Sequence, residues 1–128
     1  MNIPNKVKID GMEYKIIKCD TPIVDDDSKV LQGDIFYRKC EIRIDDRLNP
    51  QTSEMTLMHE IVHGIMHERN INMETPLETF VDELAKGFYN LLNDNPDMFS
   101  NKTELDEDNI GISDALADCI EPVFKIKP

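Results

Sequence analysis

The sequence predicts an α+β fold in which a small antiparallel or mixed sheet comes first and two helices pack on it. Apolar residues alternate along the first part of the chain, and their period changes to that of a helix near Asn49. No apolar run is long enough to cross a membrane. With 128 residues, the chain can bury a core without disulfides. We expect one domain, 1–128, with a sheet region at 1–48, a two-helix region at 49–95 and a loop-rich region at 96–128.

Alternating segments predict the strands. A tight turn at Asp10 and Gly11 should join the first two as a hairpin. Residues 21–29 read as a polar connection, whose three consecutive aspartates lack the spacing and glycine of a calcium loop. The expected strands are 6–10, 13–19, Asp34–Tyr37 and Cys40–Asp45.

Capping residues and apolar periodicity predict the helices. Asn49 and Pro50 suit the cap and first residue of a helix that continues to Arg69. A second helix should start with Thr75 as cap and Glu78 in a capping box, and should end before Asn95. Their expected buried stripes are Met55, Met58, Val62, Ile65 and Met66 in the first, and Leu77, Phe80, Val81, Leu84, Phe88, Leu91 and Leu92 in the second. Further on, a short helix is expected near Asp114 to Ile120, with an extended tail from Pro122.

Charge and cysteine usage exclude several classes of function. The formal net charge is −12, and no cluster of Lys and Arg offers a nucleic-acid surface. We expect no nucleic-acid or membrane partner. The 3 cysteines are widely spaced without a C-x-x-C pair, which favours reduced thiols. Because residues 1–20 also lack the pattern of a secretion signal, a cytoplasmic location is expected.

The segment "HEIVH" carries the clearest chemistry. On a helix, His59 and His63 lie one turn apart and can bind one Zn²⁺ ion, while Glu60 leans toward the open position of the metal. An open position lowers the pKa of bound water toward about 7, and a carboxylate can then take its proton. We therefore predict His59 and His63 as metal ligands and Glu60 as the catalytic base. Two histidines on an ordinary amphipathic helix are the plain alternative.

A third ligand must come from elsewhere. His67 lies eight residues beyond His59, about 12 Å along a helix, which is too far for one ion. His67 is either a supporting residue of the site or a surface histidine. Glu78 on the second helix is the better candidate, with Asp82 one turn on as a hydrogen-bond partner of a ligating histidine. Spacing alone leaves Glu74 and Glu83 as competitors, and Glu78 equally suits a capping box.

With this motif and a glutamate on the next helix, the chain resembles gluzincin-type metallopeptidases, and within them the small ImmA/IrrE-type proteins, which phages and mobile elements often encode. The segment "ETFVDELA", Glu78 to Ala85, is similar to their Glu-x-x-Ala-Asp-x-x-Ala motif, with Val81 in place of Ala. The resemblance covers roughly Cys40 to Pro96. Two departures are Val62, where relatives often have Gly, and the 14 residues between His63 and Glu78, a short loop.

The resemblance implies a minimal zincin-like fold, with Glu78 as third zinc ligand and Asp82 as its supporting partner. It also implies that the strand before the first helix, "KCEIRID", pairs with substrate as an added strand, although a central strand is an equal alternative. Three residues are candidates to stabilise the oxyanion, and the sequence does not rank them. They are Tyr37, Arg38 and His67.

The expected function is therefore zinc-dependent endopeptidase activity on a specific protein or peptide. By analogy with related regulators, the substrate would be a repressor or regulatory protein. The alternative is a non-catalytic, zinc-stabilised protein-binding module, which the intact Glu60 disfavours. A DNA-linked protease of the SprT type is a weaker reading, since basic residues and a cysteine ribbon are missing. The oligomeric state is left open.

Overall fold

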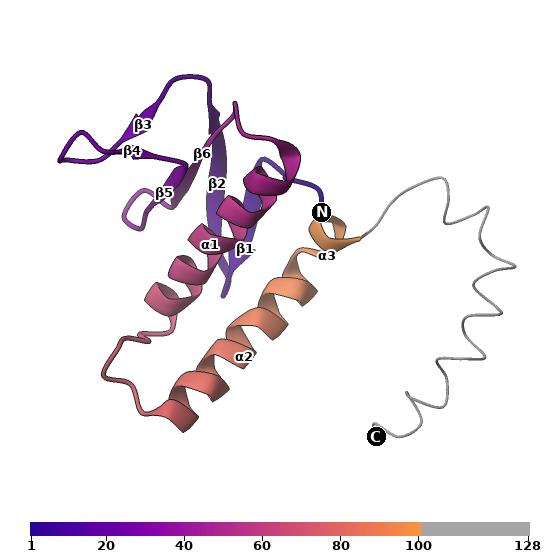
Figure 1. Ribbon diagram of the computed structural model, residues 1–128. Helices are drawn as coiled ribbons and strands as arrows, with labels where there is room; N and C mark the ends of the chain where they lie inside the picture. The colour runs from indigo at the N-terminus through magenta and orange to yellow at the C-terminus, as the bar shows by residue number, and fades with distance from the viewer. Residues whose placement is uncertain (101–128) are drawn as a thin grey trace, which may run out of the picture.

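The structure, a computed structural model, describes residues 1–100, and in this part of the chain strands come first and helices follow (Figure 1). This order confirms the predicted α+β class. The strands are β1 Lys6–Ile9, β2 Met12–Cys19, β3 Ile23–Val24, β4 Val30–Leu31, β5 Gly33–Phe36 and β6 Glu41–Asp45. The helices are α1 Pro50–Glu68, α2 Leu77–Asp94 and α3 Pro96–Phe99.

The main sheet is mixed. Its strand order is β1-β2-β6-β5, with β2 and β6 parallel and the other neighbours antiparallel. The strand β6 is therefore an interior strand with both edges paired. Edge positions belong to β1 and β5, so the expectation that the strand before α1 offers a free edge to substrate is wrong.

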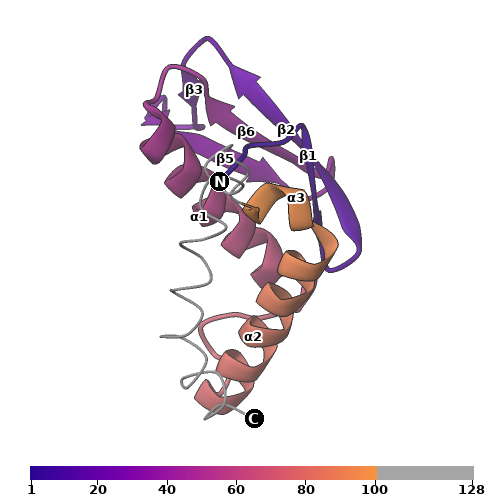
Figure 2. The same cartoon turned by 90° about the vertical axis from the view of Figure 1, so that its right-hand side faces the viewer.

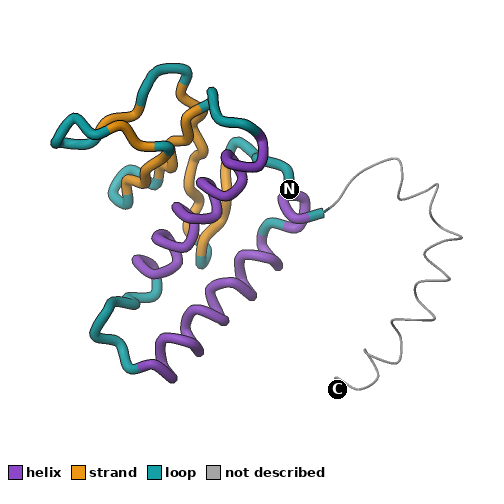
Figure 3. The backbone as a smooth tube through the Cα atoms, in the orientation of Figure 1, coloured by secondary structure: helices purple, strands orange, loops and turns teal. Residues whose placement is uncertain are grey.

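The first hairpin follows the prediction. Asp10 and Gly11 both have positive φ angles, 48° and 83°, as a two-residue turn between right-twisted strands requires. The connection that follows is more ordered than expected. Within it, β3 pairs with β4 as a separate two-stranded sheet, seen beside β5 in Figure 3. Two strands of two residues each are too short for alternation to reveal.

Helix α1 begins where the sequence predicts. The Asn49 side chain accepts a hydrogen bond from the Thr52 backbone N–H, and Pro50 is the first helical residue. Its buried face differs from the expected stripe, because Met55 is 66% exposed and the apolar residues that contact the sheet are offset round the helix. The fully buried apolar side chains of α1 are Leu57, Ile61 and Ile65.

The capping box predicted for α2 is wrong. The helix starts one residue later than expected, after Pro76, and has no side-chain cap. The Thr75 hydroxyl instead accepts a hydrogen bond from the Asn72 backbone N–H, which closes the turn before the helix. The helix ends at Asp94, as predicted. Several residues of its expected stripe are exposed, with Leu77 the most exposed at 75%.

The helices cover one face of the main sheet, and the core lies between these layers (Figure 2). Helix α1 packs across β5, β6 and β1, while α2 runs beside it and reaches β1. The Asn95 side chain fixes the end of α2 to β1, because it accepts a hydrogen bond from the Lys8 N–H and donates one to the Lys8 carbonyl.

The remaining expectations have different outcomes. Residues 96–99 form the short helix α3, which fits the short helical turn that the loop-rich region allows. The helix expected near Asp114 to Ile120 and the tail from Pro122 lie outside the described residues. Within 1–100, no helix has the length and apolar character needed to cross a membrane.

Candidate metal centre

Helix α1 places His59 and His63 one turn apart, as predicted. Their Nε2 atoms are 3.2 Å apart, and the ring planes meet at 71°. Both side chains are exposed, so the nitrogens point to a common place that solvent can reach.

This spacing suits one zinc ion. Two nitrogen ligands at 2.0–2.1 Å from a tetrahedral zinc ion lie about 3.3 Å from one another. The separation of 3.2 Å matches this value without any rearrangement of the rings. Among residues 1–100, however, no group of three His, Cys, Asp or Glu side chains is close enough together to hold an ion.

Glu60 lies beside this pair but on the inner side of α1, and only 7% of the residue is exposed. Burial raises the pKa of its carboxyl group, the two histidines counteract that shift, and the nearby charge of Asp34 adds to it. A carboxyl group with a raised pKa is suited to accept and return a proton.

A cleft of about 500 Å³ opens beside Glu60. Helix α1 forms one wall, and β4 with the start of β5 forms the other. Its lining residues are Val30, Leu31, Gln32, Gly33, Thr52, Met55, Thr56, His59 and Glu60. The candidate metal ligand His59 and the candidate base Glu60 thus share a cleft with the edge strand β5.

Gly33 allows β5 to approach α1 closely at this cleft. A Cβ atom at this position would lie 2.8 Å from both the Arg43 carbonyl oxygen and the Thr56 Cγ2, and 3.7 Å from the Glu60 Cγ. Any side chain would therefore push the edge strand away from the candidate base. Sequence reasoning missed this residue, since a glycine beside a strand gives no sign of what lies across from it.

Asp34 and Arg43 form a second feature that sequence reasoning missed. They face one another across β5 and β6, where Arg43 Nε donates to Asp34 Oδ1 at 2.8 Å and its Nη2 donates to Oδ2. The negative charge of Asp34 in this pair contributes to the raised pKa of Glu60. The sequence does place residues of opposite charge in two adjacent predicted strands. It does not give the strand register that brings Asp34 opposite Arg43.

His67 stacks on Tyr37, with ring centroids 4.0 Å apart and planes inclined by 7°. Burial raises the pKa of the Tyr37 hydroxyl, and the nearby Glu60 adds to the shift. His67 thus contacts the end of β5, and Tyr37 lies close to the candidate base. Of the three residues considered for the oxyanion, Arg38 lies in the exposed β5–β6 turn.

Helix α2 lies on the other flank of α1. A Cβ atom on Gly87 would lie 2.3 Å from the Ile65 Cγ2, so the two helices touch at these residues. Ile65 is two positions from both His63 and His67, and residues two apart lie on nearly opposite sides of a helix. The second helix therefore does not face the histidines.

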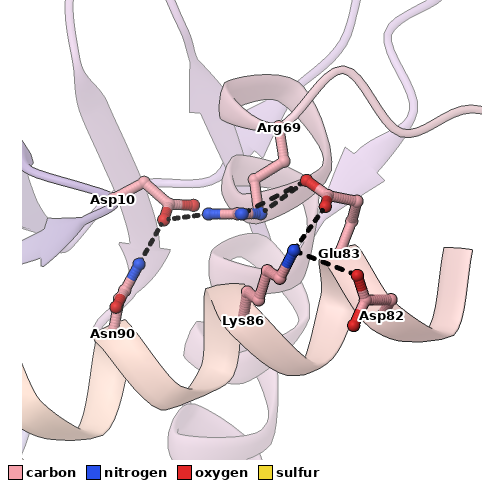
Figure 4. Close-up of polar contacts among 6 residues, drawn as sticks. All are labelled: Asp10, Arg69, Asp82, Glu83, Lys86 and Asn90. Atoms are coloured by element: carbon pink, nitrogen blue, oxygen red, sulfur yellow. Dashed lines mark hydrogen bonds and ion pairs between the residues drawn. The ribbon is translucent and has the colours of Figure 1, made fainter. Parts of the chain in front are cut away.

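Glu78 and Asp82 lie away from the histidine pair as a result. Glu83 binds Arg69, the residue that follows α1, and Glu78 lies five residues further from this contact, about 7 Å along the helix. Asp82 pairs with Lys86 at 3.0 Å (Figure 4). Glu74, the other competitor, is exposed in the turn before α2. Glu78 as third ligand stays a prediction of the resemblance, and it requires α2 to occupy another position.

Comparisons with known proteins agree with the resemblance. A family model described as Peptidase_M78, IrrE N-terminal-like domain, matches residues 15–94, which is more than half of the chain. Neither the search of curated proteins nor the search of solved structures gave a significant match. The matched range runs from β2 to the end of α2 and includes the two histidines, Glu60 and the cleft. The chain belongs to the IrrE N-terminal-like family, a family of metallopeptidase type.

Proposed function

We propose that this chain is a zinc-dependent endopeptidase that hydrolyses a peptide bond in a specific protein substrate. The observation that carries the proposal is the pair of Nε2 atoms 3.2 Å apart, one of them on His59, which lines the same cleft as the buried Glu60. A metallopeptidase needs this combination of imidazole ligands, an open position and a nearby carboxylate.

His59 and His63 would hold the zinc ion, which supplies Lewis acidity to polarise the scissile carbonyl group and to activate water. Their other ring nitrogens remain available for hydrogen bonds that orient the rings. Asp82 pairs with Lys86 on α2, and its role as a hydrogen-bond partner of a ligating histidine stays a prediction of the resemblance.

Glu60 moves the proton in this proposal. Its carboxylate takes a proton from the water molecule that attacks the carbonyl carbon, and the protonated carboxyl group then donates to the leaving amine as the C–N bond breaks. Burial disfavours the charged form of this group, which supports the second step.

The substrate would pair with β5. This strand is hydrogen-bonded to β6 on one side only, it starts in the cleft, and Gly33 holds it against α1. An extended peptide added to this edge would pass Glu60 and the histidines. The proposal thus transfers the substrate-pairing role from β6 to β5.

Tyr37 is the residue best placed to donate a hydrogen bond to the oxyanion. It follows the edge strand directly, its hydroxyl feels the charge of Glu60, and stacking on His67 fixes its ring. His67 is then a positioning residue, and its predicted supporting role would be to hold the Tyr37 ring in place.

Two parts of the proposal rest on the resemblance alone. A repressor or other regulatory protein as substrate, and a phage or mobile element as source, are expectations from related proteins. A cytoplasmic location is an expectation from the cysteine pattern.

Glu60→Gln in the full chain tests the proposal against a binding module stabilised by zinc. Glutamine keeps the size of the side chain but cannot accept the proton. We expect unchanged zinc content and a loss of cleavage of about 10²- to 10⁴-fold, measured on candidate regulatory proteins by mass spectrometry. Cleavage that is equal in Glu60→Gln and wild type would overturn the assignment of Glu60. Stoichiometric zinc with partner binding but no cleavage by wild type would favour the binding module.

A further inference from the structure

Apolar side chains that are exposed or half-buried follow one another along α1 and α2. On α2, Leu77 is 75% exposed, Val81 53% and Leu92 51%, and on α1, Met55 is 66% exposed. Leu84, Phe88, Met58, Val62 and Met66 fill the positions between them and are half-buried. We call these nine residues the two-helix apolar face. Surfaces of this kind commonly mark a docking site.

Both halves of the face lie on the same side of the molecule. On α1, Met58, Val62 and Met66 each follow a buried residue by one position, which turns them about 100° away from the sheet. On α2, Phe88 and Leu92 likewise follow the buried Gly87 and Leu91. The two helices run antiparallel (Figure 2). Because they touch at Ile65 and Gly87, these steps lead to one side of the contact.

The chain leaves the described part next to one end of this face. The carbonyl group of Met98 in α3 accepts a hydrogen bond from the Asn2 N–H, and the amino group of Met1 pairs with Glu54 on α1 at 3.6 Å. Met1 also lines a cavity of about 390 Å³ with Met55 and Met58. Residues 101–128 therefore start close to the α1 end of the two-helix apolar face.

The sequence beyond this point contains a matching apolar pattern. Ile112, Leu116, Cys119 and Ile120 follow one another at intervals of one, three or four residues, a spacing that suits the apolar stripe of a helix. Residues 101–111 can span about 36 Å when extended, whereas Met55 and Met66 are about 16 Å apart along α1. The segment is long enough to reach every part of the face.

We propose that residues 112–120 of this chain dock on the two-helix apolar face and cover it in the folded monomer. A groove between two helices that presents apolar side chains is suited to an amphipathic segment. A tether of this length also gives the segment an effective concentration in the millimolar range, so that modest affinity suffices. The inference does not rest on the proposed peptidase activity, and Met55 is the residue that the face shares with the cleft.

Disulfide formation with the native Cys119 tests the docking in the full chain. In a Cys19→Ala, Cys40→Ala background, a cysteine is introduced at Val81 on the face or at Thr79, which is two positions away on the opposite side of α2. We expect Val81→Cys to form a disulfide within the monomer at least about tenfold faster than Thr79→Cys under mild oxidation, as measured by peptide mapping. Equal rates would overturn the proposal, and so would disulfide-linked dimers, because a second copy would then cover the face.

A second measurement does not depend on cysteine chemistry. Leu116→Asp combined with Ile120→Asp should release the segment and raise the fluorescence of the dye ANS several-fold, because the dye binds exposed apolar surface. Asp118→Asn, which changes a neighbouring polar residue, should leave the fluorescence at the wild-type level. If wild type already binds the dye as strongly as the double variant, the face is open in the native chain and the proposal fails.

Discussion

The two flanks of α1 differ in the contacts that they make and in the functional groups that they carry. The flank toward β5 carries the histidines, Glu60 and a cleft, and it presents polar groups to solvent. The flank toward α2 is closed by direct contact between Gly87 and Ile65 and by ion pairs around Arg69. The candidate catalytic groups and the contacts that hold α2 therefore lie on different sides of α1. A substitution can alter one set without altering the other.

Arg69 is the strongest test of the α2 flank. Its guanidinium group binds Asp10 at 2.7 Å and Glu83 at 3.2 Å, and its side chain is only 19% exposed (Figure 4). Asn90 also donates to the Asp10 Oδ1, whereas the buried Oδ2 has no hydrogen-bond partner among the described residues. Arg69→Met would leave Asp10 with a single neutral donor. We expect a loss of about 3 kcal/mol in the free energy of unfolding, measured in urea, with unchanged zinc affinity.

Lys86→Met is the matched control for Arg69. Lys86 pairs with Asp82 and Glu83 at the exposed surface of α2 and is 55% exposed, so its removal should leave the free energy of unfolding close to that of wild type. Equal losses in the two variants would show that the Arg69 cluster does not hold α2 in place.

Substitution of the two close-contact glycines, Gly33 and Gly87, compares the two flanks of α1 directly. Gly33→Ala places a methyl group against a backbone carbonyl at the cleft, and Gly87→Ala places one against the Ile65 side chain. Each should lower stability by about 1–3 kcal/mol, since the packed elements must separate. Only Gly33→Ala should also reduce peptide cleavage, because β5 moves relative to Glu60. A loss of cleavage in Gly87→Ala that equals the loss in Gly33→Ala would contradict the separation of the flanks.

A smaller effect on stability, limited to acidic pH, is expected where β6 leads into α1. Arg47 donates hydrogen bonds from its side chain and its backbone to Asp45, and they lower the pKa of the Asp45 carboxyl group to about 2. Since the folded-state pKa is below the unfolded value of 3.8, this contribution to stability is present above about pH 4 and is lost as the pH falls toward 2. Asp45→Asn should remove this part of the acid dependence, measured by thermal unfolding between pH 2 and pH 5. An identical acid dependence in both proteins would show that Asp45 does not contribute.

Local features of the site were predictable from the sequence, and its surroundings were not. The cap at Asn49, the hairpin at Asp10 and the spacing of His59 and His63 depend on neighbouring residues, and the structure has all three as expected. Whether β5 or β6 lies at the edge depends on a parallel pairing between β2 and β6, which no local pattern reveals.

The position of α2 could not be predicted from the sequence for a similar reason. The apolar residues of α1 extend over the sheet side and the exposed side, so periodicity did not show which of them faces the second helix. The contact is made at Ile65 and Gly87, and a glycine gives no hydrophobic signal. The glutamate expected to complete the metal site therefore belongs to a helix whose side of α1 the sequence could not assign.

Zinc affinity of four full-length proteins tests the central claim most directly, namely that the metal centre is built on the β5 flank of α1. Zinc binding is measured by competition with a chelator for wild type, His59→Ala, His63→Ala and Glu78→Gln. We expect each histidine variant to lose affinity by at least about 100-fold, since each removes a ligand, and a loss of similar size in Glu78→Gln would identify the third ligand that the resemblance implies. Wild-type affinity in either histidine variant would contradict the claim, because the metal would then not be held by α1.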